Sequence, residues 1–167
     1  MPIAVQLEPR TDKAPKVKYT WDSDTEILSA HLRPGSDGSG LSGSVGLEGT
    51  DGSWVILDLN GGRINAVEVA VWPEVQQRPV LETPTKVEDA AVLIPAARSS
   101  REIRSVEVAT ALVAEANATK STYHFRLGKS SKTRAIRLAT DILLDVDAQN
   151  RVTGLWLLNV PPCPSPA

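Results

Sequence analysis

The chain has 167 residues, 41% of them hydrophobic, which suffices for one domain with a buried core or for two small halves that share one. Its formal net charge is −2 and its basic residues form no concentrated patch, so we expect no nucleic-acid partner. No apolar run approaches the about 18 residues of a membrane span, and the first residues lack the pattern of a signal peptide. Because Cys163 is the single cysteine, no intramolecular disulfide can form, and we expect a cytoplasmic, bacterial protein without a membrane partner.

The first part of the chain predicts a β-hairpin. Val17, Tyr19 and Trp21 alternate with polar residues, which is typical of a half-buried strand. Residues 22–25 favour a turn because their short polar side chains bond to nearby backbone groups, and residues 26–32 return as the second strand. A further short strand is expected over residues 3–7.

Residues 35–53 are rich in Gly and Ser, which predicts a loop followed by an edge strand over residues 44–48. Residues 38–43 spell GxGxxG, but no helix pattern follows, so we interpret them as a loop and not as a phosphate site. An apolar strand over residues 54–59 leads to a tight turn at residues 60–62 (Asn-Gly-Gly), which tolerate positive φ.

The return strand is expected over residues 64–72, with Pro73 after it. Val67, Val69 and Val71 fall on one face, and we predict that this face is in the core. The opposite face, with Ile64 and Trp72, is largely apolar too, which predicts a cover on both sides.

Residues 54–73 and 141–161 repeat one pattern, in which residues 55–59 match residues 142–146 and Asp58 matches Asp145. The matching positions after the turn are Arg63, Ile64, Val67, Val69 and Pro73 with Arg151, Val152, Leu155, Leu157 and Pro161. Such repetition predicts two copies of one structural unit. The predicted fold is therefore mainly β, with two repeated β-meander units packed as a pseudo-twofold sandwich or barrel-like domain. The predicted parts are a first repeat (1–75), a linker (76–105), a second repeat (106–161) and a disordered Pro-rich tail (162–167).

The middle of the chain is harder to interpret. Pro79, Pro84 and Pro95 exclude long helices, and residues 87–94 fit a short strand or a helical turn. Residues 100–115 fit a helix by their Ala and Glu content, with Ser99 or Ser100 as its cap, or a strand by alternation from residue 106 to 112; we favour a strand over 106–114. Residues 123–127 are then expected to pair with residues 134–138 through a turn at 129–132.

Two motifs resemble a family of small, mostly bacterial β-rich domains of unknown function. Residues 21–28 (Trp-Asp-Ser-Asp-Thr-Glu-Ile-Leu) resemble the family's opening hairpin, and residues 145–155 resemble its second hairpin, with Asn150 at a Gly position. Val67-Glu68 resembles the closing Ile–Glu of that second hairpin, after a turn one residue shorter. The second copy lacks the acidic residues of the opening motif, and Trp156 replaces the Glu. The resemblance implies a fold and no activity; some members look like companions of small toxin-like proteins, which implies protein binding.

Several residues suggest chemistry, but each has a simpler interpretation. Asp22, Asp24 and Glu26 could hold a hard cation, yet in a turn their side chains diverge, so we predict no metal. Two histidines, His31 and His124, are too few for a zinc site. Cys163 has no neighbouring base. We therefore predict no catalytic residue and no cofactor.

Asp58 and Asp145 could face each other across the pseudo-twofold and do acid–base work, or each could brace its own hairpin turn. Trp54, Trp72 and Trp156 are expected either in the core or on an aromatic surface for a partner or ligand. The candidate ligand- or partner-binding residues are therefore Trp72, Trp156, Asp58 and Asp145. They favour a non-enzymatic protein-interaction module whose partner is another protein or a second copy in a homodimer. The alternative is a small-molecule binding protein or an enzyme with a pocket at the repeat interface.

Overall fold

The computed structural model describes residues 3–10, 13–32, 43–95, 104–128 and 132–164, with the backbone alone for residues 104–110. These residues form β-strands and no helix, which confirms the prediction of a mainly β protein. The strands are β1 (Gln6–Pro9), β2 (Lys18–Asp22), β3 (Ile27–His31), β4 (Gly43–Gly49), β5 (Trp54–Asn60), β6 (Arg63–Val71), β7 (Val75–Gln77), β8 (Val87–Leu93), β9 (Arg104–Thr110), β10 (Leu112–Ala116), β11 (Tyr123–Leu127), β12 (Arg134–Ala139), β13 (Ile142–Val146) and β14 (Val152–Leu157). None of these residues belongs to a helix of the length and apolarity that a membrane crossing requires.

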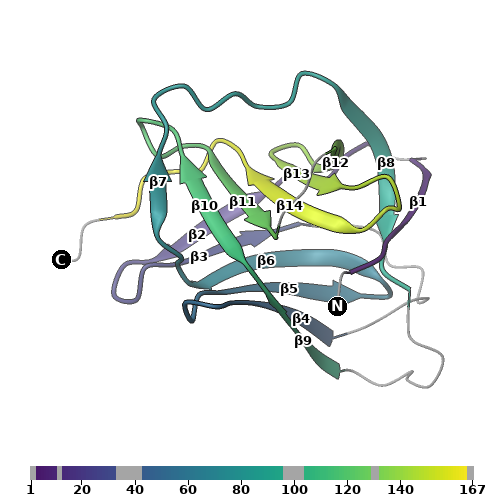
Figure 1. Cartoon of the computed structure of the whole chain (residues 1–167), viewed down its shortest axis with the longest axis horizontal. Helices are drawn as coiled ribbons and strands as arrows, with labels where there is room; N and C mark the ends of the chain where they lie inside the picture. The colour runs from purple at the N-terminus through teal and green to yellow at the C-terminus, as the bar shows by residue number, and fades with distance from the viewer. Residues whose placement is uncertain (1–2, 11–12, 33–42, 96–103, 129–131, 165–167) are drawn as a thin grey trace.

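The strands form two sheets. The eight-stranded sheet has the order β1-β8-β12-β13-β14-β11-β10-β7, and the six-stranded sheet has the order β2-β3-β6-β5-β4-β9. Neighbours are antiparallel except for three parallel pairs, which are β7 with β10, β8 with β12 and β4 with β9. Figure 1 shows the two sheets as layers, with β10, β11 and β14 in front of β2 and β3.

One apolar core lies between the layers. Val55 and Leu57 of the six-stranded sheet and Phe125, Leu144 and Leu155 of the eight-stranded sheet line the same internal gap, which measures only about 10 Å³. All five side chains are buried. Because burial of apolar surface stabilises a fold by about 25 cal/mol per Å², this shared layer is what holds the two sheets together.

The segment from residue 104 to residue 116 links the sheets. β9 pairs with β4 in the six-stranded sheet, whereas β10, one residue further on, pairs with β11 in the eight-stranded sheet. This extended run confirms the prediction of a strand over helix. The side-chain alternation at 106–110 and the proposed caps Ser99 and Ser100 lie outside the described residues.

Five strands of each sheet follow one connectivity. The order β2-β3-β6-β5-β4 has the same succession along the chain as β10-β11-β14-β13-β12. Each set ends on a parallel neighbour, β9 beside β4 and β8 beside β12. Segments predicted to belong to a linker, β7 and β8, are thus part of the eight-stranded sheet.

Both central hairpins carry a β-bulge at the same place. The pairs are Leu59–Ile64 followed by Asp58–Ala66, and Val146–Val152 followed by Asp145–Gly154. An extra residue on one strand reverses the faces beyond it. Ile64 therefore lies in the core with Val67 and Val69, and its predicted place on the opposite face is wrong. A second irregularity, opposite Trp54, leaves Val71 47% exposed instead of buried as predicted.

The turns follow the predicted chemistry. Gly61 and Gly62 join β5 to β6 with φ of 58° and 81°, and Asn150 adopts a φ of 58° before β14. Asp22 Oδ1 accepts hydrogen bonds from the backbone N–H groups of Asp24 and Thr25, as expected for a turn. These bonds lower the pKa of Asp22.

Two predicted pairings are wrong. β11 does not pair with β12; it lies between β10 and β14, and the hairpin that ends at β11 begins with β10. β4 is not an edge strand, because it lies between β5 and β9. The first error arises because the chain passes from β11 to the far side of the sheet at β12 before it returns through β13 and β14. The second arises because the neighbour of β4 is β9, a strand far along the chain that the local pattern does not indicate. Of the turn expected at 129–132, only Lys132 is described, and residues 38–42 of the GxGxxG stretch also lie outside the described part.

Candidate functional site

Four aromatic side chains from β2, the end of β6 and β11 form one cluster. Trp21 at the end of β2 stacks on Trp72, which follows β6, with ring centroids 5.8 Å apart and planes 13° from parallel. Trp72 also contacts Tyr123 at 5.0 Å and Phe125 at 5.8 Å, so the cluster joins the six-stranded sheet to the inner side of β11. The indole N–H of Trp72 donates to the carbonyl oxygen of Glu26 at 2.8 Å, which fixes the orientation of its ring.

The C-terminal segment lies across this cluster. The Trp21 indole N–H donates to the carbonyl oxygen of Pro161 at 2.8 Å. The Tyr19 hydroxyl donates to Leu158 O at 2.8 Å, and the backbone N–H of Val160 donates to Ser121 O at 2.8 Å. Burial raises the pKa of Tyr123, with a further contribution from the nearby Cys163. Residues 161–164 stay exposed.

A second cluster lies on the outer face of the eight-stranded sheet. His124 Nε2 donates to Asp145 Oδ2 at 2.8 Å, and the imidazole stacks on the indole of Trp156 with centroids 3.9 Å apart and planes 9° from parallel. Asp145 is 5% exposed. The Trp156 Nε1 is buried without a hydrogen-bond partner in the described structure, so packing and stacking alone hold this ring. Stacking on Trp156 thus fixes the plane of the imidazole ring, and the hydrogen bond to Asp145 fixes the rotation of the ring within that plane.

Sheet register explains why these side chains meet. His124 pairs across strands with Trp156, and Asp145 pairs with Gly154, one strand pair along. A Cβ atom at Gly154 would lie 2.6 Å from Asp145 Oδ2 and 3.3 Å from His124 Nε2. The absence of a side chain at Gly154 therefore leaves the space in which His124 and Asp145 approach each other.

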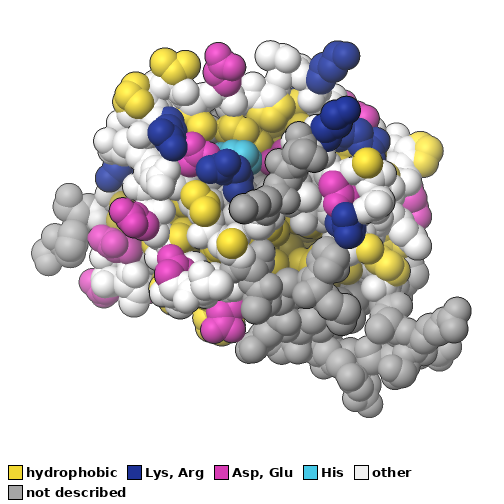
Figure 2. Space-filling view, viewed as in Figure 1, with side chains coloured by type: hydrophobic (Ala, Val, Ile, Leu, Met, Phe, Trp, Pro, Cys, Tyr) yellow, Lys and Arg dark blue, Asp and Glu magenta, His cyan; other side chains and the backbone are white. Residues whose placement is uncertain are grey.

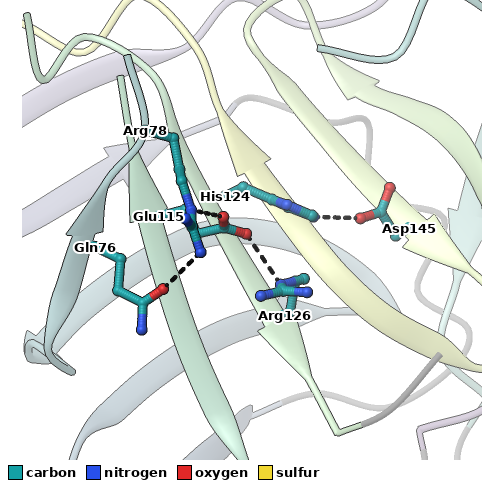
Figure 3. Close-up of polar contacts among 6 residues, drawn as sticks. All are labelled: Gln76, Arg78, Glu115, His124, Arg126 and Asp145. Carbon is teal, nitrogen blue, oxygen red and sulfur yellow. Dashed lines mark hydrogen bonds and ion pairs between the residues drawn. The ribbon is translucent and has the colours of Figure 1, made fainter. Parts of the chain in front are cut away.

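Charged residues extend this cluster along the sheet. Glu115, the cross-strand neighbour of His124, accepts from Arg78 Nε at 2.9 Å and from Arg126 Nε at 3.1 Å, and Arg78 also donates to Gln76. Figure 3 shows Glu115 between the two arginines, with His124 extending towards Asp145. In Figure 2, which looks onto this sheet, basic and acidic side chains gather around a histidine.

The predicted site residues do not form one site. Trp72 contacts Tyr123 and Phe125 on the inner side of β11, whereas Trp156 contacts His124 on its outer side, so the strand separates the two tryptophans. The third tryptophan, Trp54, is exposed at the start of β5.

The two aspartates are also far from facing each other. Asp58 is exposed on the outside of the six-stranded sheet, between the core residues Leu57 and Leu59. Asp145 points out of the other sheet, away from the shared core. The turn-bracing role belongs to Asp147, which accepts from the backbone N–H groups of Gln149 and Arg151. Of the two interpretations of these aspartates, the facing acid–base pair is therefore wrong.

Several residues of these clusters, among them His124, Trp21 and Glu115, were not predicted as site residues. The signal for His124 was its alternation with the apolar Tyr123 and Phe125, which places it on the outer face. The signal for Trp21 was its place on the same strand face as Tyr19, near the end of β2. Glu115 gave no signal, because its partners Arg78 and Arg126 come from two other strands or strand ends. In the described part of the chain no group of three or more His, Cys, Asp or Glu side chains could hold a metal ion.

No family model matches the chain, and no curated protein matches it. The resemblance of its hairpin motifs to a family of small β-rich domains therefore stays a prediction.

Proposed function

We propose that this protein is a non-enzymatic interaction module that binds an extended, proline-rich segment of a partner protein on the surface formed by Trp21 and Trp72. One observation carries the proposal. The Trp21 indole donates its N–H to the carbonyl oxygen of Pro161 at 2.8 Å, next to the stacked ring of Trp72. The chain's own tail thus makes a contact, from an indole N–H to a proline carbonyl, that a proline-rich ligand would make.

The physical basis is the low entropy of such ligands. Proline-rich segments are already extended before binding, so less conformational freedom is lost when they settle on aromatic rings. Tryptophan supplies both a flat apolar surface and one N–H donor for a backbone carbonyl. Because Trp72 is held by Glu26 O and by Tyr123, the surface is preorganised, and little is lost in ordering it.

The occupant of this surface decides the assembly state. The tail is tethered, so it competes with a partner at an effective concentration of about millimolar. If the tail of a second copy takes the place of the first, the exchange produces the homodimer expected from the sequence. The proposed ligand is a proline-rich segment that binds in trans, from another protein or from a second copy.

The alternative function, a pocket between the sheets near Asp58 and Asp145, has less support. Where Val55 and Leu57 face Phe125 and Leu144, apolar side chains fill the space between the layers and leave a gap of about 10 Å³. This is about the volume that one water needs, far below a small-molecule pocket.

The experiment compares the full chain with a variant that ends at Val160, with a fluorescent peptide of residues 159–167 (Cys163→Ser) as the probe. We expect the shortened chain to bind the peptide about tenfold more tightly, because the tethered competitor is gone. In the shortened chain, Trp21→Phe should weaken binding about fivefold, since one hydrogen bond is lost. Trp54→Phe, on the exposed start of β5, is the matched control and should change nothing. Failure of the shortened chain to bind the peptide, or equal effects of the two Phe variants, would contradict the proposal.

A pseudo-twofold repeat is supported by the common order of five strands and by the shared bulge at Asp58 and Asp145. The sandwich arrangement is supported by the core common to both sheets. The bacterial, cytoplasmic setting rests on the sequence alone.

A further inference from the structure

We propose that the outer face of the eight-stranded sheet holds a phosphate group, bound by Arg78 and Arg126 beside His124. This site is separate from the aromatic surface proposed above, because β11 lies between them and presents His124 and Arg126 on one side and Tyr123 and Phe125 on the other.

The acceptors of this cluster are already used. Both oxygens of Glu115 receive a guanidinium N–H, and the side chain is only 12% exposed. Asp145 is buried and accepts from His124 Nε2. Because buried carboxylates with satisfied oxygens offer little to solvent, neither carboxylate competes for a cation.

The donors, in contrast, are open. The side chains of Arg78 and Arg126 are 52% and 50% exposed. Arg126 contacts Glu115 through Nε, and its two terminal nitrogens have no partner in the described structure. The accessible part of the cluster is therefore a set of guanidinium N–H groups with positive charge.

The spacing suits one tetrahedral oxyanion. Arg78 and Arg126 hold opposite oxygens of one carboxylate, so their guanidinium groups are within a few ångströms of each other. His124 is the cross-strand neighbour of Glu115 and lies two residues before Arg126, on the same face of β11. Two neighbouring guanidinium groups offer pairs of parallel N–H donors, which is the way in which arginine binds phosphate.

The positions of the donors are fixed in advance. Glu115 holds both arginines through their Nε atoms. A donor set that is ordered before the ligand arrives binds more tightly than two free side chains. The two guanidinium groups are thus preorganised for a phosphate group, which belongs either to a phosphorylated side chain or to a small phosphate ester.

The test uses the two histidines as reporters in an NMR titration with inorganic phosphate, at constant ionic strength set with chloride. His124 is at the proposed site, and His31, on the other sheet, is the internal reference. We expect the imidazole signals of His124 to shift and saturate while those of His31 stay in place. Equal shifts of both histidines, or no saturation up to about 10 mM phosphate, which corresponds to binding weaker than about −3 kcal/mol, would overturn the proposal.

Variants show whether the arginines act as proposed. Arg126→Gln and Arg78→Gln should each weaken phosphate binding about tenfold, because a charge-assisted donor pair is removed. Arg134→Gln is the matched control, since it removes the same charge from an exposed ion pair with Glu88 elsewhere on the sheet. An equal loss in Arg134→Gln would mean that only net charge matters and would refute the site. A phosphoserine tripeptide and glycerol phosphate then identify the source, by which of them binds more tightly than inorganic phosphate.

Discussion

Gly154 of β14 lies opposite Asp145 of β13, and a methyl group at Gly154 would come within 2.6 Å of Asp145 Oδ2 and 2.9 Å of the carbonyl oxygen of Phe125. The same position in the other central hairpin is Ala66, opposite Asp58, and there a methyl group is accommodated. One hairpin thus has room for a buried carboxylate that is hydrogen-bonded to a histidine, and the other has an exposed aspartate.

Replacement of Gly154 by Ala should separate His124 from Asp145. The new methyl group cannot displace the Phe125 backbone, so the carboxylate has to move. We expect a loss of about 2 kcal/mol in the free energy of unfolding, from strain together with the weakened hydrogen bond. Urea denaturation measures it. Ala66→Gly, the reverse change at the equivalent position, should cost no more than about 1 kcal/mol, and equal stability of Gly154→Ala and the parent would contradict the expectation.

The two equivalent aspartates should differ in their contribution to stability. Asp145→Ala leaves His124 Nε2 without its acceptor in a buried place, which should cost about 2 kcal/mol or more. Asp58→Ala changes an exposed side chain and should stay within about 0.5 kcal/mol of the parent. Chemical denaturation of both variants checks this, and equal losses would show that the burial of Asp145 contributes nothing.

Tyr19 should make the fold sensitive to alkali. Burial is the main reason that its pKa is raised above the ordinary value near 10, and the Asp141 carboxylate adds to this. A raised pKa means that the folded protein keeps the phenol proton while the unfolded chain loses it. The stabilisation is therefore complete below pH of about 10 and falls above it, by about 1.4 kcal/mol per pH unit.

Tyr19→Phe tests this contribution. The variant lacks the hydrogen bond to Leu158 O, so it should be less stable at neutral pH. Its stability should then decrease less steeply with pH than that of the parent when both are denatured in urea from pH of about 9 to 11. Parallel pH profiles of the two proteins would mean that Tyr19 does not contribute to the alkaline sensitivity.

Asp147 should act in the opposite pH range. Hydrogen bonds from the backbone N–H of Arg151, and from the side chain of Arg151, lower its pKa. A lowered pKa means that the stabilisation is present above the unfolded value of about 4 and is lost as pH falls through the folded value. Asp147→Ala should therefore destabilise the protein at pH 7 and hardly at all at pH of about 2. Thermal unfolding at the two pH values measures the difference, and an effect as large at low pH as at pH 7 would refute it.

Local chemistry was sufficient to predict most strands and turns. Alternation at Val17, Tyr19 and Trp21 gave β2, and the positive φ of Gly61, Gly62 and Asn150 follows from residue types that tolerate it. Asp22 braces its turn as short polar side chains do. These features depend on residues a few positions apart, so a single sequence contains the information.

Pairing between distant strands was beyond local reasoning. Nothing near residues 123–127 indicates that β11 lies between β10 and β14, and nothing near Ile64 indicates the bulge that turns it into the core. Of the candidate site residues, Asp145 was predicted either to face Asp58 or to brace its own turn, and its partner in the structure is His124.

By itself the sequence determined a mainly β chain, its turns and the apolar residues of its two hairpins, because strand period and turn conformation are properties of neighbouring residues. Only the tertiary structure decided that Trp21 meets Pro161, that Glu115 joins Arg78 to Arg126 and that His124 lies between Trp156 and Asp145. Each of these contacts depends on the order and register of strands that are far apart in the chain. That order is set by how the two sheets together bury the most apolar surface, which is a property of the whole fold.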